Sequence, residues 1–160
     1  MTRIARIRPE TSARPPQAAV AHRETSPSGG KKSRGRVLIV DDEMLIRWSV
    51  AQILVSAGYD VAEAANAKDA LRCVTAEPQP DVVLLDYHLP DSNDVRLLQT
   101  IRTLAPSTAV IMITASATSE LAAGAVRLGA HCVINKPVDL HELAPLIEQA
   151  LASHLRGLER

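Results

Sequence analysis

Short apolar runs alternate with longer stretches of helical periodicity along the chain from residue 36 onward. The runs hold four to six residues, and most of them lack a polar residue at every second position. Such runs are typical of strands that are covered on both faces of a sheet. We predict strands at residues 36–40, 59–64, 81–85, 108–113 and 131–134. The second, "YDVAEA", is the most polar, so we expect it near an edge of the sheet.

Five further stretches repeat apolar residues at intervals of three and four, which places them on one face of a helix. We predict helices at residues 43–57, 67–76, 94–104, 118–128 and 139–156. The residues expected on the buried face of the third helix are Leu97, Leu98, Ile101 and Leu104. Gly58 and Gly129 directly follow the first and fourth stretches, as expected of residues that end helices. Pro145 lies inside the last stretch, where it removes a backbone donor.

Alternating strands and helices are the organisation of α/β domains. Five strands with four helical crossovers and a closing helix predict a parallel sheet with helices on both faces. We place the folded domain at residues 36–156, between an N-terminal segment at 1–35 and a C-terminal tail at 157–160. We expect this domain to stand alone, because few residues follow it.

The net charge of zero conceals an uneven distribution of charged residues. Residues 1–36 contain nine basic and two acidic residues, whereas residues 37–160 contain nine basic and sixteen acidic ones. Residues 1–35 are also rich in Pro, Ser, Gly and Ala, so we interpret them as a disordered basic tail. Such a tail either remains solvated or contacts an acidic surface, which would be nucleic acid or the acidic domain itself.

Several classes of protein are disfavoured by the composition. No run approaches the roughly 18 apolar residues that a membrane span requires. The N-terminus has no apolar signal region, so we expect a cytoplasmic protein without a membrane partner. Cys73 and Cys132 are far apart in apolar stretches and lack metal-binding spacing, which predicts small buried hydrophobic residues.

Polar residues stand where four of the predicted strands end. They are Asp41 and Asp42, then Asp86, then Thr114, and finally Asn135 with Lys136. The carboxyl ends of parallel strands meet at one edge of an α/β sheet, and ligands bind there. We therefore expect three carboxylates, a hydroxyl and an ammonium group to converge at that edge.

This set of groups suits phosphoryl transfer. Three neighbouring carboxylates repel one another unless a cation lies among them, and Mg²⁺ prefers such oxygen ligands. Lys136 and Thr114 would then bind phosphoryl oxygens, and Asp86 would be the nucleophile. Ala115 is small enough to leave its backbone N–H accessible to the phosphoryl group. Asp41 is also a good N-cap for the first helix, a role compatible with metal binding.

Four motifs carry a resemblance to a known family. They are "LIVDDE" at 38–43, "LLDYHLPDS" at 84–92, "MITAS" at 112–116 and "INKP" at 134–137. In this order and spacing they resemble the receiver domain of bacterial two-component response regulators. "DDEMLIRWSV" and "LPDS" most resemble the receivers of sigma-54-dependent activators. The resemblance implies a doubly wound, flavodoxin-like sheet in the strand order 2-1-3-4-5.

The resemblance also implies roles for individual residues. Asp86 would accept phosphate from a phosphohistidine on a sensor histidine kinase or a histidine phosphotransfer protein. Asp42 would bind Mg²⁺ directly and Asp41 through water, and Asp86 with the backbone carbonyl of His88 would complete the protein ligands. Thr114, Lys136 and the Ala115 N–H would bind the phosphoryl group. The Lys136–Pro137 bond is expected to be cis.

A receiver of this kind is a self-catalysed phosphoryl acceptor rather than a turnover enzyme. It would switch between two states and signal through a protein contact or a homodimer made by residues 118–156. Two positions depart from the usual pattern, because Val133 replaces an aromatic residue and Asp94 replaces glycine. The side chain of His88 would lie at the rim of the site and tune hydrolysis.

Three other interpretations remain open from the sequence. A phosphohydrolase would use the same aspartyl phosphate, but such enzymes place a second acid where this chain has His88. A DNA-binding regulator would use the basic tail, although we expect no specific DNA recognition without a helix-turn-helix motif or interleaved aromatic residues. A degenerate receiver would bind partners without phosphate, but the acidic and lysine set is complete.

Overall fold

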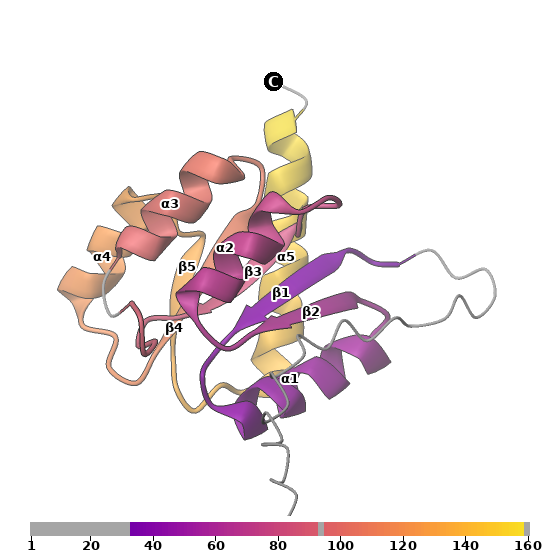
Figure 1. The fold of residues 1–160 in the computed structure, drawn as a ribbon, viewed down its shortest axis with the longest axis horizontal. Coiled ribbons are helices and arrows are strands. Elements are labelled where there is room, and N and C mark those ends of the chain that lie inside the picture. Colours follow the sequence, from indigo (N-terminus) through magenta and orange to yellow (C-terminus); the bar gives the residue numbers. More distant parts are fainter. Residues whose placement is uncertain (1–32, 93–94, 159–160) are drawn as a thin grey trace, which may run out of the picture.

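The structure is a computed structural model that describes residues 33–92 and 95–158 (Figure 1). Strands and helices alternate throughout. The elements are β1 (Arg36–Val40), α1 (Met44–Ser56), β2 (Asp60–Ala64), α2 (Ala67–Thr75), β3 (Val82–Asp86), α3 (Arg96–Leu104), β4 (Ala109–Thr114), α4 (Ser119–Arg127), β5 (Cys132–Asn135) and α5 (Leu140–Leu158). Each predicted strand and helix is present, with ends that differ by at most two residues.

The five strands form one parallel sheet in the order β2-β1-β3-β4-β5. The strand order that the resemblance implied is therefore confirmed, and the polar strand β2 lies at an edge as expected. The register aligns the carboxyl ends of neighbouring strands. Val40 pairs with Leu85, Asp86 with Ile113, and Thr114 with Asn135. The residues that follow β1, β3, β4 and β5 consequently share one edge of the sheet.

Two layers of helices cover the sheet, with α2, α3 and α4 on one face and α1 and α5 on the other (Figure 1). Alternate residues of the central strand β3 enter the two cores: Val83 and Leu85 pack with the first layer, and Val82 and Leu84 with the second. This burial on both faces explains why β3 is apolar without alternation. Cys73 and Cys132 are free and partly buried, and each packs against one of the two cores.

Helix ends largely follow the sequence signals. Gly58 and Gly129 each come two residues after the end of α1 and α4, with φ values of +94° and +100°, a conformation that glycine adopts without steric cost. Pro145 lies inside α5, and the Lys136–Pro137 bond is cis as expected. Asp41 does not occupy the N-cap of α1, because Glu43 does.

The predicted burial of Leu104 is wrong. Its side chain is 44% exposed, whereas Leu97, Leu98 and Ile101 are buried. Leu104 is the last residue of α3, and the following Ala105, which is fully buried, takes the inward position there. The proposed tail at residues 1–35 lies mostly outside the described residues, as do Asp94 and the last two residues of the C-terminal tail. Within the described part of the chain, none of the helices is long and apolar enough to cross a membrane.

One carboxylate fixes the loop after β3 to the start of α2. Asp91 accepts hydrogen bonds from the backbone N–H groups of Ala67 at 2.8 Å and Lys68 at 3.1 Å. Burial works to raise the pKa of Asp91, but these bonds hold it below its ordinary value. The contact therefore places a negative charge at the N-terminus of α2, where the helix dipole favours it.

Two leucines of α3 provide a matched test of the core. Leu98→Ala should lower the free energy of unfolding by about 3 kcal/mol because it leaves a cavity in a fully buried position. Leu104→Ala removes the same atoms from an exposed position and should cost less than about 1 kcal/mol. Urea denaturation of both variants measures the difference, and equal losses would contradict the observed packing.

The Asp91 contact predicts a pH-dependent contribution to stability. Asp91→Ala should cost about 1 kcal/mol at pH 7, the usual value of a capping side chain. A lowered pKa means that this contribution is present above the unfolded value near about 4 and disappears as pH falls through the folded value. The difference in urea midpoint between Asp91→Ala and the unchanged chain should therefore be largest at pH 7 and should shrink as the pH is lowered into the acid range. Glu77→Ala, at an exposed acid, is the control and should show no such change.

Candidate functional site

Three carboxylates meet at the carboxyl edge of the sheet. Asp41 and Asp42 follow β1, Asp86 ends the neighbouring strand β3, and one oxygen from each lies within 4.8 Å of the others. The predicted convergence of the three carboxylates is therefore observed. Asp41 and Asp86 are buried, whereas Asp42 is exposed, so the cluster opens to solvent on one side. Its hard oxygen atoms can hold a metal ion.

Lys136 supplies a positive charge to this cluster. Its Nζ lies 2.9 Å from Asp41 Oδ2, 3.0 Å from Asp86 Oδ2 and 3.3 Å from Glu43 Oε1. The residue follows β5, so its side chain crosses the end of β4 to reach β3 and β1. Its backbone N–H donates to the carbonyl of Thr114 at 2.8 Å, which fixes the start of the side chain.

The surroundings shift the pKa values of both partners upward. Burial raises the pKa of the Asp86 carboxyl, and the charge of Asp41 adds to this effect. The N–H of His88 and the ammonium of Lys136 favour the ionised carboxylate but do not cancel the burial. Burial alone would lower the pKa of Lys136, yet its hydrogen bonds to Asp41 and Asp86 raise it. Lys136 is therefore a permanent cation at neutral pH.

The other predicted site residues lie around the cluster. Thr114 ends β4 and is fully buried, and its hydroxyl accepts a hydrogen bond from the Ser116 N–H at 3.3 Å. Among the described contacts, none joins Thr114 directly to Asp86. Ala115 is exposed beside it. His88 is exposed at the rim, and its backbone N–H donates to Asp86 Oδ1 at 3.1 Å. The roles of its carbonyl and of the Ala115 N–H stay predictions.

Sequence reasoning missed two residues that support the site and gave a third, Asn135, no role. Glu43 is a third acidic partner of Lys136. Arg47 donates to the carbonyl of Asp41 at 2.7 Å and to the carboxylate of Glu63 at 3.1 Å, which joins the ends of β1 and β2. Asn135 accepts a hydrogen bond from the Ala117 N–H at 2.8 Å. Arg47 is the single charged residue in α1, a signal that could have identified it.

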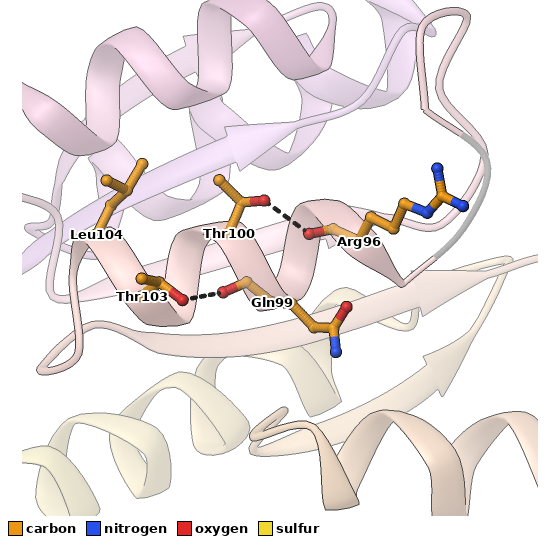
Figure 2. A pocket seen from close by; sticks show the side chains of 5 residues that line it. All are labelled: Arg96, Gln99, Thr100, Thr103 and Leu104. Atoms are coloured by element: carbon orange, nitrogen blue, oxygen red, sulfur yellow. Dashed lines mark hydrogen bonds between the residues drawn. The ribbon is translucent and has the colours of Figure 1, made fainter.

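A shallow hollow on the outer face of α3 is a different feature (Figure 2). It is lined by Arg96, Gln99, Thr100, Thr103 and Leu104. Figure 2 shows the hydroxyls of Thr100 and Thr103 hydrogen-bonded to the carbonyls of Arg96 and Gln99 in the preceding turn. Among the described residues that line this hollow, none is a carboxylate or a nucleophile aimed into it, so the edge of the sheet is the better functional site.

The chain is similar to curated regulators over most of its described length. It is 34% identical to the DNA-binding transcriptional regulator NtrC of Proteus hauseri over 121 residues, which are 76% of this chain and 25% of the relative. It is 40% identical to the response regulator protein PilR of Pseudomonas aeruginosa over 119 residues, which are 74% of this chain and 26% of the relative. The chain thus spans about a quarter of the length of these relatives.

Solved structures share its fold. A CheY-like receiver domain protein from Methanospirillum hungatei superimposes with a TM-score of 0.72 at 34% identity, covering 77% of this chain and 98% of that one. NtrX from Brucella abortus, solved in complex with ADP, gives a TM-score of 0.72 at 34% identity and covers 78% of this chain but 29% of that one. A family model described as the response regulator receiver domain matches residues 37–148. The chain therefore belongs to the response regulator receiver domain family.

Proposed function

We propose that Asp86 accepts a phosphoryl group from the phosphohistidine of a sensor histidine kinase or a histidine phosphotransfer protein. The observation that carries this proposal is the meeting of three carboxylates and the Lys136 ammonium at one edge of the sheet. The half-open position of the cluster supports it, because a donor has to reach Asp86 from solvent.

In the proposed reaction a carboxylate oxygen of Asp86 attacks phosphorus. A P–O bond forms and the P–N bond of the phosphohistidine breaks, so the imidazole nitrogen keeps the electron pair and takes a proton from solvent. The ammonium of Lys136 lies 3.0 Å from Asp86 and would neutralise one phosphoryl oxygen. The Thr114 hydroxyl and the Ala115 N–H would bind the others after a shift of the loop that follows β4.

Mg²⁺ fits the oxygen donors of this site. Asp42 and Asp86 would bind it directly, Asp41 through water, and the backbone carbonyl of His88 would complete the protein ligands. The ion would offset the charge that accumulates when a phosphoryl group joins three carboxylates. The mutual proximity of the carboxylates within 4.8 Å supports this assignment.

We further propose that this receiver acts in the cytoplasm and is not a turnover enzyme. The match of the receiver family to residues 37–148 supports a signalling role for this domain. Its phosphorylated form would contact a protein or a second copy through residues 118–156. The curated relatives are named as DNA-binding or regulatory proteins, but we propose no specific DNA recognition by this chain.

Phosphoryl labelling tests the acceptor. The full chain incubated with Mg²⁺ and acetyl phosphate should gain one phosphoryl group by intact mass, and Asp86→Asn should abolish the gain. Asp60→Asn, which changes a carboxylate at the opposite end of the sheet, should label normally. Full labelling of Asp86→Asn would reject the acceptor, and sustained hydrolysis of a phosphomonoester would indicate a phosphohydrolase instead.

Lys136 and Mg²⁺ should compete for the same carboxylates, because the ammonium contacts both Asp41 and Asp86. Lys136→Met should bind Mg²⁺ about tenfold more tightly, which corresponds to about 1.4 kcal/mol, and should label with acetyl phosphate more slowly. Isothermal titration calorimetry measures the affinity. Lys68→Met, at an exposed lysine of α2, should match the unchanged chain. Weaker Mg²⁺ binding by Lys136→Met would contradict the competition.

A further inference from the structure

Helix α1 carries large apolar side chains on its outer face as well as on its buried face. Val50, Ala51 and Leu54 are buried against the sheet. On the outer side Met44, Leu45, Trp48 and Val55 are 67%, 73%, 57% and 48% exposed. With 3.6 residues per turn, these four fall within about 100° of one another around the helix. We call them the α1 stripe, and it runs from the first turn of the helix to the last.

The α1 stripe is not interrupted by charge. Arg47, the single charged residue of α1, turns away to the Asp41 carbonyl and Glu63. The hydroxyls of Ser49 and Ser56 donate to the carbonyls of the preceding turn at 2.8 Å, so they do not make the surface polar. Gln52 is the one polar residue exposed within the arc of the stripe. Four large apolar side chains left exposed on one side of a helix have the character of a contact surface.

The described chain begins beside this helix. The Arg34 N–H donates to the Gly58 carbonyl at 3.1 Å, and its guanidinium donates to the carbonyl of Ala57 and pairs with Glu148. The same group lies 5.3 Å from the centre of the Tyr59 ring. These contacts fix the point from which residues 1–32 depart at the C-terminal end of α1. The helix is about 20 Å long, a distance that about six extended residues span.

The composition of residues 1–32 complements the surroundings of the stripe. This segment has seven basic and two acidic residues, a formal charge of +5, and residues 33–160 carry −5. Its stretch "RIARIR" at 3–8 combines three arginines with Ile4 and Ile7. Asp42 and Glu43 are exposed at the N-terminal end of α1, beside Met44. The arginines of this stretch would pair with these two acids, and its isoleucines would pack on the apolar side chains of the stripe.

We propose that residues 3–8 of this same chain dock on the α1 stripe and cover it. The tether favours this occupant over a free partner, because a short linker gives an effective concentration on the order of millimolar. The docked arginines lie toward the acidic end of the stripe, next to the carboxylate cluster. Release of the segment exposes the stripe. This proposal does not depend on phosphorylation of Asp86.

Trp48 is the single tryptophan of the chain, so its fluorescence reports on the stripe alone. Acrylamide should quench Trp48 weakly in the full chain and about twofold more strongly after deletion of residues 1–32. Arg3→Glu, Arg6→Glu and Arg8→Glu combined should have the same effect in a full-length chain whose cores are intact. Added salt should also increase quenching in the full chain, because it screens the charges.

Matched leucine variants identify the surface. Leu45→Ser should abolish the salt dependence of quenching, whereas Leu104→Ser, at an exposed leucine of α3, should preserve it. A synthetic peptide of residues 1–32 should restore shielding of the deleted chain at millimolar concentration. Equal quenching of the full and deleted chains would overturn the proposal. Shielding that rises with protein concentration would overturn it too, because a second copy would then cover the stripe.

Discussion

Neighbouring carboxylates that are partly buried repel one another and require a positive charge among them. The position of every residue in the cluster at the carboxyl edge of the sheet depends on this requirement. Lys136 provides this charge from the end of β5, which the strand order places beyond β4. Its N–H is fixed by the hydrogen bond to the Thr114 carbonyl, and its side chain is long enough to pass β4 and contact Asp86. The rise in the pKa of Asp86 reflects how incompletely one ammonium compensates the loss of water. A carboxylate cluster whose negative charge is incompletely compensated favours the binding of a further cation.

Much of the fold could be predicted because burial on both faces leaves a clear trace in a sequence. Strands such as β3 are apolar at every position before the last, and helices such as α3 repeat apolar residues on one side. Periodicity does not show where the core ends, and for that reason Leu104 was wrongly placed inside it. Periodicity does not determine the strand order either. The order 2-1-3-4-5 was predicted from the resemblance of four motifs to a known family. Ends of elements depend on local hydrogen bonds, such as those around Gly58.

The candidate site was partly predictable for a geometrical reason. Parallel strands bring their carboxyl ends together, so Asp41, Asp42, Asp86 and Lys136 could be assigned to one place from their positions after strands. Contacts that depend on the reach of a side chain were not predictable. Glu43 lies just before α1 and Arg47 on its first turn. Only the three-dimensional structure shows that Glu43 contacts Lys136 and that Arg47 contacts the Asp41 carbonyl.

The two residues at the end of β5 have a mechanical consequence. Asn135 accepts a hydrogen bond from Ala117, at the approach to α4, and its neighbour Lys136 contacts Asp41 and Asp86. Both ties pass through one peptide unit. A change in the contacts of Lys136 would therefore act beside the residue that is bonded to Ala117. The carboxylate cluster and the approach to α4 are joined by this short path along the backbone.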